Sequence, residues 1–284
     1  MNKKKVVKVL KWILIPIFVV LFVCQGYYLL QRYWAHKDGY FVPKYDKVEL
    51  TEESDYETIF LQTGLGQSAV EKLVKQKGFQ AVVDAQTAFF NPPKAECQEL
   101  IWWITREDLY QDENSGGVKR YLVDLQPGDI LISLSTHTIG WHHGHAAIVL
   151  DQYTLIESAV LGADSQIASI GDWCNYSNYA VLRIKDVTPE QQQEVVAYCK
   201  ENLAGVPYSL LSGIFGDKAP APDSEFFGLQ CSYLAWYAWY QFGYDLDSDG
   251  GRIVTPHDLL HSDKVEIVQI YGMDPYQFVE ETEE

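Results

Sequence analysis

The chain has 284 residues, enough for one domain of ordinary size with an appendage. Hydrophobic residues make up 47% of it, with 8 Trp and 19 Tyr, so a sizeable core can form and a disordered chain is excluded. Residues 1–37 hold seven Lys/Arg and no Asp/Glu, which leaves 15 basic and 39 acidic residues, a net charge of −24, on the rest. Such a surface repels phosphate backbones, so nucleic-acid binding is excluded.

The N-terminal segment predicts a membrane anchor. Trp12 to Leu30 form a run of 19 uncharged residues, "WILIPIFVVLFVCQGYYLL". As a helix, this run would span about 28 Å at about 1.5 Å per residue. Five lysines precede it and only Arg32 and Lys37 follow closely, so the N-terminus is expected in the cytoplasm and the rest outside the cell membrane. A cleaved signal peptide is the alternative, but no small-x-small site follows the run.

Composition and pattern divide the chain into four parts. We expect the lysine-rich end and anchor at 1–31, a juxtamembrane connector with a helical layer at 32–119, an α+β domain at 120–272 and an acidic tail at 273–284. The helical layer is expected to pack on the domain that follows it rather than to form an independent module.

Three runs in the helical layer carry apolar residues at helical spacing: "YETIFLQTG", "SAVEKLVKQKG" and "FQAVVDAQTAFF". The first two end at a glycine, and Ser68 is the expected N-cap of the second. "CQELIWWIT" predicts a strand, and "DENSGG" at 112–117 predicts a loop.

The pattern changes after residue 120. Four short runs, "GDILISL", "HAAIVL", "TLIESA" and "YAVLRI", predict strands, and "KVEIVQIY" predicts a last one. A helix is expected after Thr188 as N-cap and Pro189 at the first helical position. A second helix, "CSYLAWYAWYQFG", begins near Cys231, and "TPHDLLHS" predicts a short third one. Strands and helices in this order indicate an α+β domain.

The five cysteines, at 24, 97, 174, 199 and 231, are too few for a disulfide framework, although one bridge stays open. Cys231 differs from the others because it stands at the expected first turn of a helix. The partial positive charge of that terminus lowers a thiol pKa, and its N–H groups can stabilise an oxyanion. The alternative is a buried structural cysteine, which is the interpretation given to Cys174 and Cys199.

A cysteine nucleophile needs a base, and the base needs an acceptor that orients it. His145 opens the strand "HAAIVLD", and Glu157 lies on the next one, where an unpaired acid would be costly. A two-residue turn between the strands would place Glu157 on the face opposite His145. A three-residue loop at 151–153 pairs Ala147 with Glu157 and brings both side chains to one face. The catalytic hypothesis therefore predicts the three-residue loop.

Six motifs follow one another in an order that resembles a known family: "LQPGDILIS", "HGHAAIVL", "LIESA", "VPYS", "LQCSYLAW" and "IVTPHDLLHS". Their order is similar to that of the permuted papain-like, NlpC-type cysteine hydrolases, in the YiiX/YebB-like amidase branch. The resemblance covers about 125 to 265. It implies a small antiparallel sheet packed on helices, with the base ahead of the nucleophile in the chain.

Carried over residue by residue, the resemblance implies Cys231 as nucleophile, His145 as general base and Glu157 as the group that orients the imidazole. Tyr208 in "VPYS" matches a family tyrosine near the site, and Asp129 in "PGDI" matches a family aspartate at the start of the first core strand. Both are predicted to contact the substrate, and for Asp129 a turn or cap function is the alternative. Tyr233 departs from the pattern, since relatives often have a small or acidic residue there. It is predicted to influence which substrate binds.

By the resemblance, Cys231 would attack an amide or ester carbonyl, and water would release the acyl-enzyme without a cofactor. The expected substrates are cell-wall peptide amides or N-acyl and lipid amides. The alternative is a catalytically inactive, membrane-tethered binding module of the same fold.

Two patterns suggest metals, and neither is complete. His137, His142, His143 and His145 could supply zinc ligands, but there is no His-Glu-x-x-His or paired-Cys motif. The first three are therefore expected at the cleft rim or in solvent. "DLDSDGG" at 245–251 copies the start of a calcium loop, but its twelfth position is Pro256 instead of Glu. No metal site is predicted, and this loop is interpreted as a solvated acidic turn.

Overall fold

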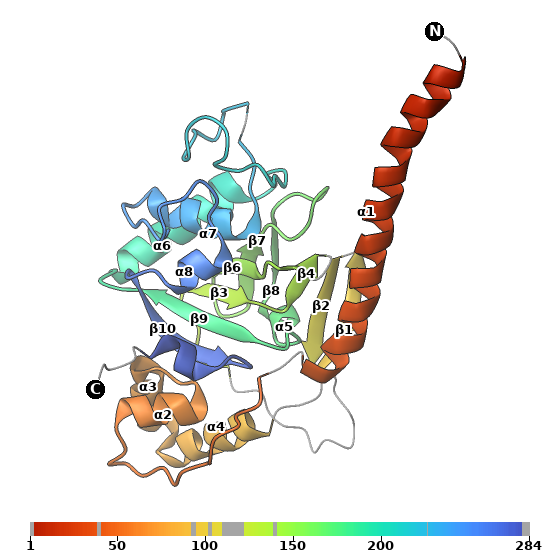
Figure 1. Ribbon diagram of the computed structural model, residues 1–284. Helices are drawn as coiled ribbons and strands as arrows, with labels where there is room; N and C mark the ends of the chain where they lie inside the picture. Colours follow the sequence, from red (N-terminus) through yellow and green to blue (C-terminus); the bar gives the residue numbers. More distant parts are fainter. Residues whose placement is uncertain are drawn as a thin grey trace.

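The computed structural model describes residues 3–38, 41–91, 95–101, 104–109, 122–138, 141–225 and 227–279. They form a mixed α+β structure of antiparallel sheets and helices, from which one long N-terminal helix projects (Figure 1).

The projecting helix, α1, runs from Lys3 to Asp38. Its segment Leu10–Leu30 has a mean hydropathy of 2.3, and 6% of it is buried. This segment is long and apolar enough to cross a membrane, as the sequence predicts, and a signal sequence would have the same character. The orientation of the helix and the location of the domain stay predictions.

The central sheet has six antiparallel strands in the order β10-β9-β3-β6-β7-β8. Their bounds are β3 Ile130–Ser133, β6 His145–Val149, β7 Thr154–Glu157, β8 Gln166–Ser169, β9 Tyr179–Ile184 and β10 Val265–Tyr271. Five of the six strands were predicted from apolar runs. The sixth, β8, is a largely exposed edge strand without an apolar run, so its sequence carried no signal.

Helices cover both faces of this sheet. Ile130 and Ile132 of β3 belong to the core formed with α6 (Pro189–Tyr198) and α7 (Cys231–Tyr240). Leu131 between them belongs to a second core, because successive residues of a strand point to opposite faces. This second core includes residues of α2 (Tyr56–Thr63), α3 (Gln67–Lys77) and α4 (Gln80–Phe90), the orange layer in Figure 1. The strands β3, β6 and β9 are therefore buried on both faces.

Two of the three predicted helix caps are present. Thr188 caps α6 and Thr255 caps α8 (Pro256–Leu260), each through a capping box with proline in the first turn. A π-helical turn, Cys199–Leu203, extends α6. The prediction of Ser68 as a cap was wrong, because α3 begins one residue earlier and Gly66 is its N-cap.

A second sheet, with the order β1-β2-β4-β5, was not predicted. Its strands are β1 Ala95–Ile101, β2 Ile104–Leu109, β4 Thr136–Thr138 and β5 Trp141–His142. The run predicted as one strand is therefore a hairpin, and its second strand pairs with the histidine-rich segment, Thr105 opposite His137. The loop predicted at 112–117 lies outside the described residues. The N-terminal half of the chain thus supports the strand that leads to His145.

Candidate active site

Cys231 is the first residue of α7, as predicted, and the helix packs against β6. Gln230 precedes it in extended backbone, and the Cys231 thiol donates to the Oε1 atom of Gln230 at 3.6 Å. The backbone N–H groups of Ala146 and Ser232 also favour the charged form of the sulfur and lower its pKa. Cys231 is 7% exposed, so the sulfur is nearly enclosed by polar contacts rather than by apolar packing alone.

His145 is the first residue of β6 and lies opposite Ser133 at the end of β3. Gly144, the preceding residue, has a φ of +73°, which residues other than glycine rarely adopt. A Cβ atom at Gly144 would come within 2.6 Å of the Ser133 carbonyl oxygen. Only glycine therefore lets the chain turn into β6 at this point, and the turn places the imidazole beside α7.

The loop between β6 and β7 has the register that the catalytic hypothesis requires. Ala147 is paired with Glu157, and the Leu150 N–H donates to the Thr154 carbonyl, so residues 151–153 form the loop. The predicted three-residue loop is confirmed. His145 and Glu157 share a face, and the imidazole Nε2 lies 2.8 Å from the Glu157 Oε2. The other ring nitrogen, Nδ1, is left to interact with Cys231, which helps to raise the pKa of His145.

A tryptophan that the sequence did not single out supports the imidazole. Trp173 ends α5 (Ile170–Trp173) and stacks on His145 with ring centroids 5.3 Å apart and an interplanar angle of 22°. Its indole Nε1 donates to the Glu157 Oε2 at 3.2 Å. Tyr176 packs on Trp173, and the Arg106 guanidinium lies 4.3 Å from the centre of the Tyr176 ring. The second sheet therefore contributes Arg106 to the surroundings of the site. The spacing of residues in the sequence did not predict this contribution.

The electrostatics of the three residues favour an ion pair. Burial disfavours the Cys231 thiolate, but the hydrogen bond and charge of His145 and the N–H groups of Ala146 and Ser232 outweigh it, so the pKa of Cys231 is lowered. Burial also disfavours the imidazolium, but the charge that Tyr176 can carry and the contacts with Cys231 and Glu157 raise the pKa of His145 well above its ordinary value.

Glu157 completes the charge pattern. Burial raises the pKa of the Glu157 carboxyl. The hydrogen bonds from His145 and Trp173 and the charges of His145 and Arg106 lower it by more, so the net shift is downward. The directions of these three shifts favour the charged form of each group, namely thiolate, imidazolium and carboxylate.

Cys199 provides an internal contrast. It is fully buried, and burial raises the pKa of its thiol to about 12 because no donor compensates for the lost water. Cys231 is also buried, yet its pKa moves the other way. The difference comes from the imidazole and the backbone N–H groups, not from exposure. All five cysteines are free thiols, so no disulfide competes for Cys231.

Tyr208 lies near the sulfur. It forms a parallel bridge with Leu229, two residues before Cys231, and its amide donates to the Ala163 carbonyl. Burial and the charge of Cys231 raise the pKa of the Tyr208 phenol, which keeps it protonated at neutral pH. A neutral phenol beside a thiolate is a hydrogen-bond donor that a bound carbonyl could use.

Asp129 and Tyr233 are not brought to the triad. Asp129 accepts two hydrogen bonds from the Arg183 guanidinium, at 2.9 and 2.8 Å, and one from the Gln126 N–H. It precedes β3 at the end opposite Ser133, about 13 Å from His145 along the strands. The Tyr233 hydroxyl donates to the Lys218 carbonyl at 2.7 Å, and the residue is 1% exposed. Both side chains hold structure together where the resemblance had placed substrate contacts.

The remaining histidines do not behave as a metal cluster. His137 is fully buried, which corrects its expected place at a rim or in solvent, and its Nε2 lies 3.5 Å from the Glu107 Oε1. His143 contacts Thr138 and its own neighbour Gly144 through its ring nitrogens. The side chain of His142 lies outside the described residues. Among the side chains that the structure describes, no histidine belongs to a group of three close ligand atoms.

Replacing Glu157 by glutamine is expected to lower turnover about 10- to 100-fold without abolishing it, because an orienting group contributes only part of general-base catalysis. The amide can still contact the imidazole but carries no charge to hold it as imidazolium. Steady-state kinetics would measure the loss. The matched control is Glu266→Gln. It removes a carboxylate of β10 that lies 4.0 Å from the guanidinium of Arg183 on β9. An unchanged rate in Glu157→Gln would remove Glu157 from the mechanism.

Comparison with known proteins adds little to this geometry. No family model matches the chain, and no curated protein matches it. The solved structures include one similar chain, the crystal structure of the metalloprotein yiiX from Escherichia coli O157:H7, described as DUF1105. It is 15% identical with a TM-score of 0.40, and the match covers 51% of this chain and 97% of that one. This likeness is weak.

Proposed function

We propose that the protein is a membrane-anchored, extracytoplasmic cysteine hydrolase of the amidase or peptidase type, with a permuted papain-like domain. The observation that carries the proposal is the convergence of Cys231, His145 and Glu157. They come from α7, β6 and β7, and they meet in the order nucleophile, base and orienting acid. Convergence of this kind is recognised by geometry and roles rather than by sequence position.

The reaction begins from the thiolate and imidazolium. The Cys231 sulfur attacks the carbonyl carbon of an amide, and the C–S bond forms as the carbonyl electrons move to oxygen. The N–H groups at the start of α7 have no intrahelical acceptor and are suited to bind that oxyanion. The imidazolium of His145 gives its proton to the leaving nitrogen as the C–N bond breaks, which leaves a thioester on Cys231.

Water then completes the cycle. Neutral His145 takes a proton from a water molecule, which attacks the thioester carbonyl. The C–S bond breaks, the carboxylic acid leaves, and the thiolate and imidazolium are restored. Glu157 holds the ring so that Nδ1 faces the sulfur throughout, since its carboxylate occupies Nε2 at 2.8 Å. Trp173 limits rotation of the ring by stacking on it.

The substrates proposed are cell-wall peptide amides or N-acyl and lipid amides. Residues after Tyr208 favour the acyl-amide class, because Leu210, Leu211 and Phe215 are 60%, 57% and 61% exposed. Exposed apolar side chains gathered in one segment are typical of surfaces that meet lipid or another apolar partner. The N-terminal anchor would keep the domain close to such substrates.

A binding module without turnover is the second candidate, and the enclosure of the site favours it. Cys231 is 7% exposed and His145 is 5% exposed, so an amide carbonyl must enter through a small opening. A protein that only binds acyl chains would have no need for an ionised sulfur, however, and the lowered pKa of Cys231 argues for chemistry.

The test is to incubate the full-length protein, in neutral-lipid nanodiscs, with peptidoglycan fragments and separately with N-acyl amide lipids. We expect mass spectrometry to detect the free acid and amine in one of the two reactions, and a thioester adduct on Cys231 early in that reaction. Neither product nor adduct from either class, with protein that is folded by circular dichroism, would favour the binding module.

A further inference from the structure

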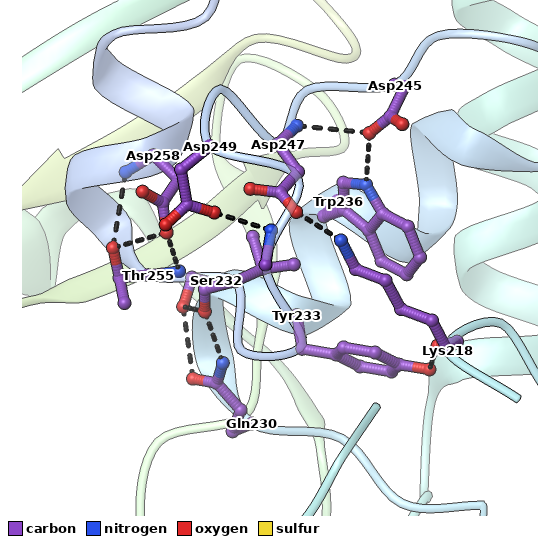
Figure 2. Close-up of polar contacts among 12 residues, drawn as sticks. Lys218, Gln230, Ser232, Tyr233, Trp236, Asp245, Asp247, Asp249, Thr255 and Asp258 are labelled. Carbon is purple, nitrogen blue, oxygen red and sulfur yellow. Dashed lines mark hydrogen bonds and ion pairs between the residues drawn. The ribbon is translucent and has the colours of Figure 1, made fainter. Parts of the chain in front are cut away.

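The loop between α7 and α8 brings three carboxylates together beside the nucleophile's helix. Asp247 and Asp249 belong to the loop, and Asp258 belongs to α8. One carboxylate oxygen from each lies within 4.8 Å of the others (Figure 2). Two oxygens bound to one calcium ion at about 2.3–2.6 Å can lie up to about 5 Å apart. The three side chains therefore fit a single coordination sphere.

The Asp247 side chain is a second observation that points to a bound cation at this cluster of carboxylates. Its side chain is 0% exposed, and its Oδ1 has no hydrogen-bond partner among the described residues. Its other oxygen, Oδ2, is paired with the Lys218 ammonium. Figure 2 shows that the oxygen not bound to Lys218 points toward Asp249 and Asp258. Buried carboxylate oxygens are ordinarily satisfied, so this atom calls for a positive partner.

The two other carboxylates each have one oxygen that accepts hydrogen bonds from the backbone or side chain of the same segment. Asp249 accepts the Gly251 N–H at 2.6 Å through Oδ1, and Asp258 accepts the Thr255 N–H and hydroxyl, both at 2.7 Å, through Oδ2. Each of them thus uses one oxygen to fix its orientation and keeps the second. Three carboxylates facing one ammonium leave a charge of −2, which one divalent cation neutralises.

The arrangement explains why the sequence pattern looked incomplete. In the calcium-loop pattern, Asp245 is the first position, but its carboxylate accepts the Trp236 indole N–H at 2.7 Å and the Asp247 N–H, and so turns away. The twelfth position is Pro256, the first residue of α8. Asp258, two residues further on, is brought by this short helix to the place where a glutamate ligand is missing.

We propose that Asp247, Asp249 and Asp258 bind one calcium ion, with Lys218 retained on the outer oxygen of Asp247. All three donors are carboxylate oxygens, two from a loop and one from the short helix α8, which suits the large and flexible coordination shell of calcium better than the strict octahedron of magnesium. The affinity is expected to be weak, with a dissociation constant of about 10⁻⁴–10⁻³ M, as in extracellular calcium modules.

The proposed ion would brace the start of α7. The Val254 carbonyl, in the same loop, accepts hydrogen bonds from Gln230 Nε2 at 2.6 Å and from Ser232 Oγ at 2.8 Å, on either side of Cys231. Pro256 packs against Gly144, just before His145. Calcium is therefore expected to rigidify the frame that holds nucleophile and base, although binding itself does not depend on the hydrolase proposal.

The experiment uses full-length protein in phosphatidylcholine nanodiscs, which carry no anionic lipid to bind calcium. Thermal unfolding is followed in EDTA and in calcium chloride up to about 10 mM, where a site of the expected affinity is nearly filled. We expect a saturable rise in Tm for the wild type and none for Asp249→Asn. Asp263→Asn, which removes an exposed carboxylate paired only with Lys264, should keep the full rise.

Two further measurements keep the proposal testable whatever the variants do. In EDTA, Asp249→Asn should be at least as stable as the wild type, because it relieves repulsion between neighbouring carboxylates. Terbium should show luminescence sensitised by Trp236, whose indole contacts the loop through Asp245, and calcium should displace it. Absence of both the Tm rise and the luminescence in the wild type would mean that Lys218 alone neutralises the cluster. An equal rise with magnesium would overturn the choice of calcium.

Discussion

Replacing Cys231 by serine is expected to abolish labelling by a thiol-reactive acyl probe and to reduce hydrolysis by about 10⁴-fold or more. Serine has nearly the same volume, so α7 and its packing should persist. Its hydroxyl, however, cannot be ionised by the contacts that lower the pKa of Cys231. Mass spectrometry of the labelled protein, and a rate assay with the substrate class that gives products in the incubation experiment, would measure both losses.

The matched control for this substitution is Cys174→Ser. Cys174 is half-buried and lies next to Trp173, so a general effect of removing a thiol near the site would appear in this variant as well. We expect Cys174→Ser to label and turn over as the wild type does. Continued labelling of Cys231→Ser would assign the reactive sulfur to another residue. A folded wild-type protein that never labels would leave only the binding module.

Replacing His145 by alanine is expected to lower turnover by about 10²–10⁴-fold and to shift the alkylation profile of Cys231 to higher pH. The imidazolium lowers the pKa of Cys231, so its removal must raise that pKa. In the wild type the rate of iodoacetamide alkylation should rise through a midpoint below that of an ordinary thiol. In the variant the midpoint should move to higher pH, because only the N–H groups of Ala146 and Ser232 then act against the burial of the sulfur.

The same two pKa shifts give turnover a bell-shaped dependence on pH. The thiolate–imidazolium pair exists above the lowered pKa of Cys231 and below the raised pKa of His145, so activity should fall off on both sides of that interval. His261→Ala is the control, since it removes an exposed histidine that stacks on His257. An unchanged Cys231 profile in His145→Ala would show that the imidazole does not control the sulfur.

Local patterns predicted the elements that position the proposed site. The start of α7 at Cys231 and the cap at Thr188 follow from helix signals, which depend on neighbours in the chain. The strand pattern left a two- or a three-residue loop open, and the catalytic hypothesis predicted the loop at 151–153 that is present. The pairing of Ala147 with Glu157 was the decisive case, since the alternative turn would have put the acid on the other face.

Other features depended on contacts between distant segments and had no local signal. The strands β4 and β5 have three and two residues, too few to show a period. Trp173 acts through its stacking on His145, which the short helix α5 brings about, while the sequence drew attention to the neighbouring cysteine. Asp258 joins Asp247 only because α8 folds back beside the loop.

Two predicted substrate contacts, Asp129 and Tyr233, stay predictions, and the directions of their side chains do not support them. A resemblance transfers a residue's position in a motif, but not the direction of its side chain. Arg183 on β9 claims both oxygens of Asp129, and Tyr233 reaches toward Lys218 on the far side of α7 from the sulfur. Neither partner could be read from the motifs themselves.

The hairpin of β1 and β2 has a practical consequence for anyone who wishes to shorten the chain. A cut at residue 120 looks natural from composition, yet it would strip β4 of its neighbour and take Glu107 away from the interior His137. It would also delete Arg106, whose charge helps keep Glu157 ionised. A version without the anchor should therefore begin between the anchor and α2. In a fragment starting at 120, the position of His145 is expected to be disturbed more than that of Cys231.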